Sequence, residues 1–160
     1  MKLKNALEKF LSVAAEMGYM NALLYAINRF SASRGGVEHI RRYIFVAQPI
    51  PADSLLPEGR GTSIEVREVT SEDTALTQLP LPPYILKYRF DQGAICLGAF
   101  KGSTIIGCIW LCLGPYNEDE VRCLFLPLPE GKAAWDFDVY LAPKQRLGFA
   151  FLRLWDSACV

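Results

Sequence analysis

The residues with the clearest chemical potential lie near the end of the chain, from Val139 to Asp156. An apolar stretch ends at Leu141, a loop with Pro143 and Gly148 follows, and the remaining residues have helical spacing. This order predicts a strand, a loop and a helix. A helix that starts directly after a loop presents free backbone N–H groups and the positive end of its dipole. The junction therefore predicts a phosphate-binding site.

The strand that leads into this junction spans residues 134–141 and carries two carboxyl groups. Strict alternation predicts one polar face and one apolar face. Two acids on one face raise each other's pKa, which would suit proton transfer; solvated residues on an exposed face are the alternative, and both stay open. The polar face would hold Asp136, Asp138 and Tyr140, and the apolar face Trp135, Phe137, Val139 and Leu141.

The preceding elements must position this junction. Alternation over Ile64–Val69 predicts a half-buried strand, and Thr70–Asp73 resembles a helix start with a hydroxyl cap. The turn at Lys101–Ser103 predicts a hairpin. Further predicted elements are a helix to about Gln78, a helix over 84–90, strands over 95–100 and 104–113, and another strand over 121–126.

The front of the chain reads as a separate helical segment. Apolar spacing predicts a helix over residues 2–33, broken near Gly18, followed by a strand over 39–47 and a linker rich in proline and glycine. We interpret the helices as a hairpin packed on its own domain; contact with a membrane surface or a partner stays open. The resulting segments are 1–36 (helical), 37–62 (strand and linker) and 63–160 (core).

Composition narrows the function classes. Hydrophobic residues make up 51% of the chain, which excludes a disordered protein. Seventeen basic and seventeen acidic residues cancel, so no nucleic-acid partner is expected. The single histidine and five scattered cysteines predict no metal site. We expect reduced, buried thiols, with Cys108 and Cys112 on one strand face, in a cytoplasmic protein.

The order of elements from Ser63 onward, together with the residues Gln145, Gly148 and Ala150, resembles the GCN5-related N-acetyltransferase (GNAT) family. Its hallmark is Gln/Arg-x-x-Gly-x-Gly/Ala between the fourth strand and the next helix. The hairpin with Gly107 also resembles the family. The resemblance implies an α+β (α/β) fold with a mixed, mostly antiparallel central sheet flanked by helices, here with an N-terminal helical extension.

The resemblance also implies an activity: transfer of an acetyl group from acetyl-CoA to the amine of a small molecule or peptide. The loop would hold the pyrophosphate, and the strand backbone would pair with the pantetheine arm. The catalytic candidates are Asp136, Asp138 and Tyr140, with the N–H near Val139 polarising the thioester. The cofactor-binding candidates are Val139, Leu141, Gln145, Arg146, Leu147, Gly148, Phe149 and Ala150.

Three departures from the family pattern leave an alternative open. The glycine falls one residue early relative to Pro143, and the strand over 121–126 is extra and would reverse the last strand. The family's later strands are expected to be absent after the helix that begins near Arg146. The alternative is therefore an inactive GNAT-like module that binds CoA or a partner. The acceptor, and whether the chain forms a homodimer, stay open.

Overall fold

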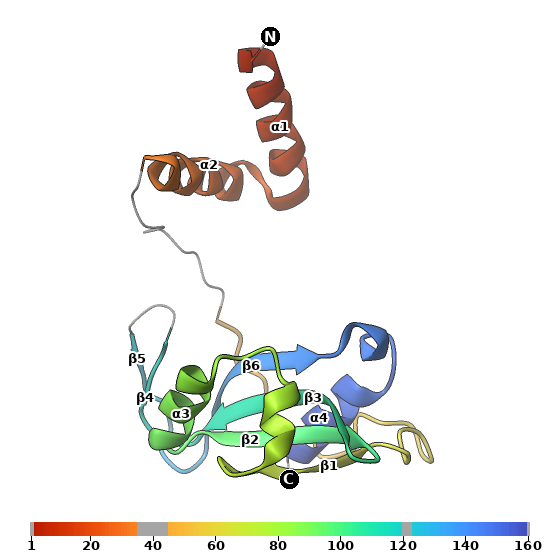
Figure 1. Ribbon diagram of the computed structural model, residues 1–160. Helices are drawn as coiled ribbons and strands as arrows, with labels where there is room; N and C mark the ends of the chain where they lie inside the picture. The colour runs from red at the N-terminus through yellow and green to blue at the C-terminus, as the bar shows by residue number, and fades with distance from the viewer. Residues whose placement is uncertain (1, 35–44, 120–122, 160) are drawn as a thin grey trace. The chain divides into compact units, whose positions relative to one another are not determined.

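The computed structural model describes residues 2–34, 45–119 and 123–159 (Figure 1). The chain divides into two units, Met1–Gln48 and Pro49–Val160. In the first unit, α1 (Lys2–Met17) and α2 (Tyr19–Ser33) confirm the predicted helix with a break at Gly18. Gly18 has φ +83°, a left-handed value that glycine tolerates without strain, and the chain turns there.

The second unit is built on a four-stranded antiparallel sheet in the order β1-β2-β3-β6. The strands are β1 (Glu65–Val69), β2 (Ile95–Lys101), β3 (Thr104–Cys112) and β6 (Trp135–Leu141). The predicted hairpin at Gly102 is confirmed: the residue has φ +59° and joins β2 to β3. A mixed helix-and-sheet fold with an antiparallel centre is therefore what the chain adopts.

Two short helices connect β1 to β2, namely the 3₁₀ helix η1 (Thr74–Gln78) and α3 (Pro83–Asp91). The cap of η1 differs from the hydroxyl cap predicted at residues 70–71. Asp73 caps it instead: its carboxylate accepts a 2.9 Å hydrogen bond from the Ala75 N–H. The same carboxylate forms an ion pair with Arg67, whose Nη1 lies 2.6 Å from Asp73 Oδ2. The Ala75 bond and then Arg67 lower the pKa of Asp73. The Asp73 carboxylate therefore both caps the helix and pairs with a cation, which a hydroxyl cap would not do.

Helices cover both faces of the sheet (Figure 1). The η1 and α3 residues pack on the face that carries Trp110, while α4 (Ala150–Ala158) buries Ala150 and Leu154 against the opposite face. Cys108 and Cys112 are both buried on the Trp110 face, as predicted. Each face thus has its own apolar core.

The described residues of the segment 121–126 do not form an extra strand of the main sheet. Residues 121 and 122 lie outside the described residues, and Leu124–Phe125 forms β5, which pairs with β4 (Tyr116–Asn117) in a separate two-stranded sheet. This hairpin is an excursion between β3 and β6, so β6 still runs antiparallel to β3. The direction of the last strand, which the sequence left open, is therefore antiparallel to β3.

Residues 45–62 have no regular structure, so the described part of the strand predicted over 39–47 is wrong; residues 39–44 lie outside the described residues. The linker from Pro49 onward is tied to α4. The Ser54 hydroxyl and the Leu55 N–H (2.6 Å) both donate to the Asp156 carboxylate. These bonds, led by that of Ser54, lower the pKa of Asp156.

No helix within the described ranges combines the length and the apolar character required to cross a membrane.

Candidate functional site

The edge of β6 presents two backbone N–H groups away from the sheet. The Ala142 N–H donates to the Ile106 carbonyl at 2.9 Å, which fixes the alternation along the β3–β6 pair. In an antiparallel pair every second residue points its backbone N–H and C=O groups at the neighbouring strand. Ala142, Tyr140 and Asp138 therefore face β3, and the N–H and C=O groups of Val139 and Leu141 point outward. Arg146 Nε confirms this direction, since it reaches the Leu141 carbonyl at 3.4 Å. Within the described sheet β6 is an edge strand.

The loop after β6 begins with the 3₁₀ turn η2 (Pro143–Gln145) and leads into α4. The first hydrogen bond of α4 runs from the Arg153 N–H to the Phe149 carbonyl at 2.9 Å. The backbone N–H groups of residues 150–152 therefore have no carbonyl partner one turn earlier. Inside the loop, Gln145 N–H bonds Ala142 O at 2.7 Å and Gly148 N–H bonds Gln145 O at 3.1 Å. The donors left for an anion are therefore those at the helix start.

Gly148 has open surroundings. A Cβ placed there would meet only the Gln145 carbonyl oxygen, at an ordinary 3.5 Å. Ala150 is different, because its side chain is fully buried in the core under α4 and its small size serves packing. Leu147 lies at the other extreme, with a fully exposed side chain. Of these three residues, Gly148 leaves free space at the junction.

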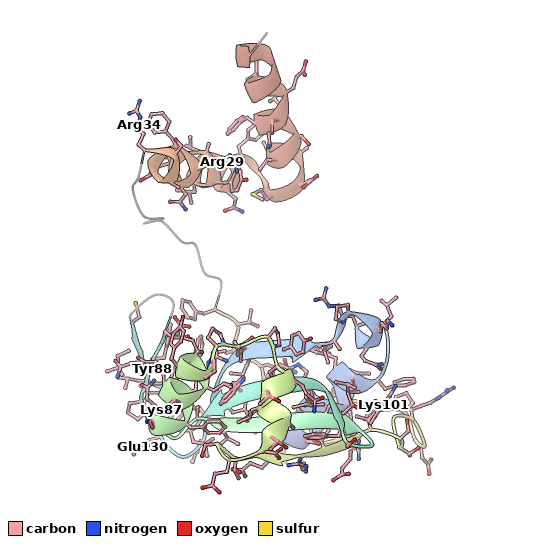
Figure 2. All side chains as sticks on the ribbon, viewed as in Figure 1. Arg29, Arg34, Lys87, Tyr88, Lys101 and Glu130 are labelled. Carbon is pink, nitrogen blue, oxygen red and sulfur yellow. The ribbon has the colours of Figure 1, made fainter. Side chains whose placement is uncertain are left out.

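Basic side chains surround the junction. Lys101, at the end of β2, donates from Nζ to Gln145 Oε1 at 2.9 Å (Figure 2). The Arg60 guanidinium lies 5.8 Å from the centre of the Phe149 ring, and Lys144 and Arg146 belong to the loop itself. The backbone N–H groups in the first turn of α4 have no helical partner. Together with these cations they suit a ligand that carries several negative charges.

The predicted faces of β6 are wrong because the strand contains a bulge. Trp110 pairs with Asp138 and Leu111 with Asp136, so Phe137 has no partner of its own. Opposed residues share a face, which places Asp138 and Tyr140 on the Trp110 face and Asp136 on the α4 face. The apolar residues divide in the same way: Trp135 and Phe137 pack with Trp110, whereas Val139 and Leu141 pack with α4.

The two acids consequently have different surroundings. Asp136 is exposed and has no hydrogen-bond or ion-pair partner in the part of the chain that the structure describes. Neighbouring atoms partly desolvate its carboxyl group, which raises its pKa. Desolvation alone is responsible, so the expected mutual effect of Asp136 and Asp138 does not operate.

Asp138 belongs to a buried charge cluster centred on Arg89 of α3. Arg89 is 5% exposed; its Nη1 donates to Asp138 Oδ2 at 2.7 Å, and its Nη2 lies 3.5 Å from Asp119 Oδ2. The guanidinium stands 5.1 Å from the Trp110 ring centre and 5.2 Å from that of Phe137. Burial by itself would lower the pKa of Arg89. The hydrogen bond to Asp138 and the negative charges of Asp138 and Asp119 have the larger combined effect, so the pKa of Arg89 is raised.

Polar atoms without partners gather around this cluster. Tyr116 is fully buried and stacks on Phe137 with ring centres 4.3 Å apart. Burial, and then the charge of Asp119, raise the pKa of Tyr116. Buried polar atoms usually have partners, so their concentration marks a second candidate site. Those without one among the described residues include Arg89 Nε, Trp110 Nε1, Tyr116 OH and Asp119 Oδ1.

The β4–β5 hairpin is held against α3 beside the cluster. Gln92 exchanges two bonds with the Asn117 backbone, at 2.8 and 3.1 Å, and the Tyr88 hydroxyl donates to Asn117 O at 3.0 Å (Figure 2). The sequence interpretation missed Arg89. A signal was present, because Arg89 follows Leu86 by three residues and so shares the buried face of its helix.

Other chemistry finds little support in the described residues. No group of three or more His, Cys, Asp or Glu side chains there is placed to hold a metal ion. Cys96 and Cys108 are fully buried, and the hydrogen bond between them, followed by burial, raises the pKa of the Cys96 thiol. A thiol in this state is a poor nucleophile.

Comparisons with protein-family models, curated proteins and solved structures found no match.

Proposed function

We propose that the second unit binds acetyl-CoA along β6 and at the start of α4, and transfers the acetyl group to an amine. The observation that carries the proposal is the continuity of three features on one segment. The outward N–H groups of Val139 and Leu141 lead directly to the loop and then to the unpaired first turn of α4. A pantetheine arm contains amides that pair with a strand edge, and its pyrophosphate suits a helix start lined by cations.

The residues present fit this ligand. The edge of β6 offers donor and acceptor groups at strand spacing, and Gly148 leaves the approach to the helix start free of a side chain. Lys101 and Arg146 place positive charge at either end of the loop. Acetyl-CoA itself supplies the reactive thioester.

For the transfer, we assign the outward N–H of Val139 to the thioester carbonyl oxygen, where negative charge develops. The amine nitrogen forms the new C–N bond as the C–S bond breaks, the amine proton passes to a base, and CoA leaves as a thiolate that takes its proton from water. Asp136 suits the base because its carboxylate is unpaired and its pKa is raised. Asp138 does not, because Arg89 holds it at 2.7 Å.

Calorimetry with the full chain and acetyl-CoA tests the binding. Gly148→Glu should abolish it by placing bulk and negative charge before the helix, whereas Gly148→Ala should fold and bind like the wild type, since its Cβ fits. Turnover should be followed by chromatography of released CoA, because the exposed thiol of Cys123 would react with thiol reagents. Failure of the wild type to bind acetyl-CoA would reject the proposal.

One observation favours a second candidate, a GNAT-like module that binds CoA or a partner without catalysis. The paired acids expected on one strand face are separated, and one of them is held in an ion pair. Binding of acetyl-CoA with no release of CoA across a panel of primary amines would support this alternative. An Asp136→Asn variant that lowers CoA release while keeping the binding affinity would exclude it.

A further inference from the structure

The α1–α2 unit buries very little of its own apolar surface. In its described part the buried residues are two alanines, Ala14 and Ala22. Large apolar side chains normally provide the core of a folded unit, and a large exposed apolar surface marks an interaction site. The large apolar side chains left exposed on the two helices are Leu7, Leu11, Met17, Tyr19, Met20, Leu23, Tyr25, Ile27 and Phe30.

Four of these residues form one stripe along α2. Met20, Leu23, Ile27 and Phe30 recur at intervals of three and four residues, which places them on a single helix face. Their exposed fractions are 61%, 48%, 44% and 56%. The stripe is about 15 Å long at 1.5 Å per residue. We call these four residues the α2 stripe.

One positive charge lies at the end of the α2 stripe, and two others line the groove between α1 and α2. The Arg34 guanidinium stands 4.0 Å from the Phe30 ring centre, at the end of the stripe (Figure 2). A groove of about 350 Å³ between α1 and α2 includes Lys9 and Arg29 among its lining residues and no acidic residue. The α2 sequence contains no Asp or Glu, and residues 1–36 hold five basic and two acidic side chains.

We propose that the α1–α2 unit binds the surface of an anionic lipid membrane. The α2 stripe would enter the boundary between headgroups and acyl chains, and Arg34 at its end would contact a lipid phosphate. Lys9 and Arg29 in the adjoining groove would add attraction to the anionic surface. Long basic side chains keep their charge in the headgroup layer while their aliphatic stems lie on apolar surface. This inference does not depend on the acetyl-CoA site.

Two other occupants fit the surface less well. A second copy of the chain would offer these cations no acidic residue from its own α2, which contains neither Asp nor Glu. An acidic helix of another protein would fill one groove, but the exposed apolar residues extend over both α1 and α2. A lipid surface can take up the α2 stripe together with exposed residues of α1, and its negative charge complements the excess of basic residues in this unit.

Co-sedimentation of the full chain with vesicles tests the proposal. We expect binding to vesicles of phosphatidylcholine and phosphatidylglycerol at 7:3, little binding to phosphatidylcholine alone, and loss of binding as salt rises. Exchanging Lys9 and Arg29 for Gln should weaken binding about fivefold per charge, or about 25-fold together. Lys132→Gln, which removes an exposed charge from the second unit, should bind like the wild type.

The double variant Leu23→Glu and Ile27→Glu should abolish vesicle binding, and glutamate preserves helix propensity. The matched control is Leu128→Glu, at a residue that is 73% exposed in the second unit, and it should bind normally. Circular dichroism reports whether the variants stay helical. The lipid and salt series on the wild type decide the question even if a variant misfolds. Equal binding to both vesicle types, or no binding with concentration-dependent dimers instead, would overturn the proposal.

Discussion

Replacing Arg89 by methionine tests whether the buried charge cluster stabilises the second unit. The variant keeps most of the side-chain volume but leaves the Asp138 and Asp119 carboxylates, 32% and 10% exposed, without their cation. Removing one partner of a buried pair costs about 3–5 kcal/mol. We expect the lower end, about 3 kcal/mol, because Asp138 retains some access to water.

Urea unfolding followed by tryptophan fluorescence measures this cost within one unit. All three tryptophans, Trp110, Trp135 and Trp155, lie in the second unit. A loss of about 3 kcal/mol corresponds to a fall in Tm of roughly 10 °C for a unit of this size. The matched control is Lys87→Met on the same helix, where a 75% exposed lysine pairs with Asp91. That change should stay within about 0.5 kcal/mol.

A double-mutant cycle with Asp138→Asn isolates the contact between Arg89 and Asp138. Groups joined by a short bond should show a coupling energy of about 2 kcal/mol, so the double variant loses less than the sum of the two single variants. Additive losses, or an Arg89→Met variant as stable as Lys87→Met, would refute the reasoning. The 2.7 Å contact between Arg89 and Asp138 would then carry no measurable energy.

Three further predictions concern single residues. Gly107→Ala should lower the stability by about 1–3 kcal/mol in urea titrations, because its Cβ would lie 2.8 Å from the Tyr140 carbonyl oxygen and 2.6 Å from Leu141 Cδ2. Asp156→Asn should cost about 1 kcal/mol at neutral pH. Because the pKa of Asp156 is lowered on folding, its contribution exists above its ordinary pKa of 3.8 and fades as pH falls below it; a pH-independent loss would contradict this. Asp136 has a raised pKa, so stability is lost as pH rises through that pKa, and thermal melts of Asp136→Asn should show a weaker decline over the same range.

The local elements could be predicted from the sequence because their signals are local. Alternation identified the strand that the structure places at Glu65–Val69, and the turn at Gly102 identified the β2–β3 hairpin. Each of these signals lies within a few residues of the element that it specifies. The break at Gly18 belongs to the same class.

The parts that failed depend on contacts between distant residues. Arg89 bonds Asp138, 49 residues later, and Asp119, 30 residues later, and no local pattern reports such partners. The faces of β6 were wrong because one unpaired residue, Phe137, shifts the alternation by one. The strand predicted over 121–126 is only the two-residue β5 in the described part, and its partner β4 is too short to leave a pattern in the sequence.

The bulge at Phe137 links the two candidate sites through one strand. On its N-terminal side Asp136 lies on the α4 face, and on its C-terminal side Asp138 lies on the opposite face, where Arg89 bonds it. The next residues, Val139 to Leu141, direct alternate N–H groups outward, in the register that lies between the bulge and the Ala142–Ile106 bond. The Arg89–Asp138 bond therefore stabilises the register that presents the strand edge. A charge cluster that touches no ligand would in this way still determine how well the edge is positioned to bind one.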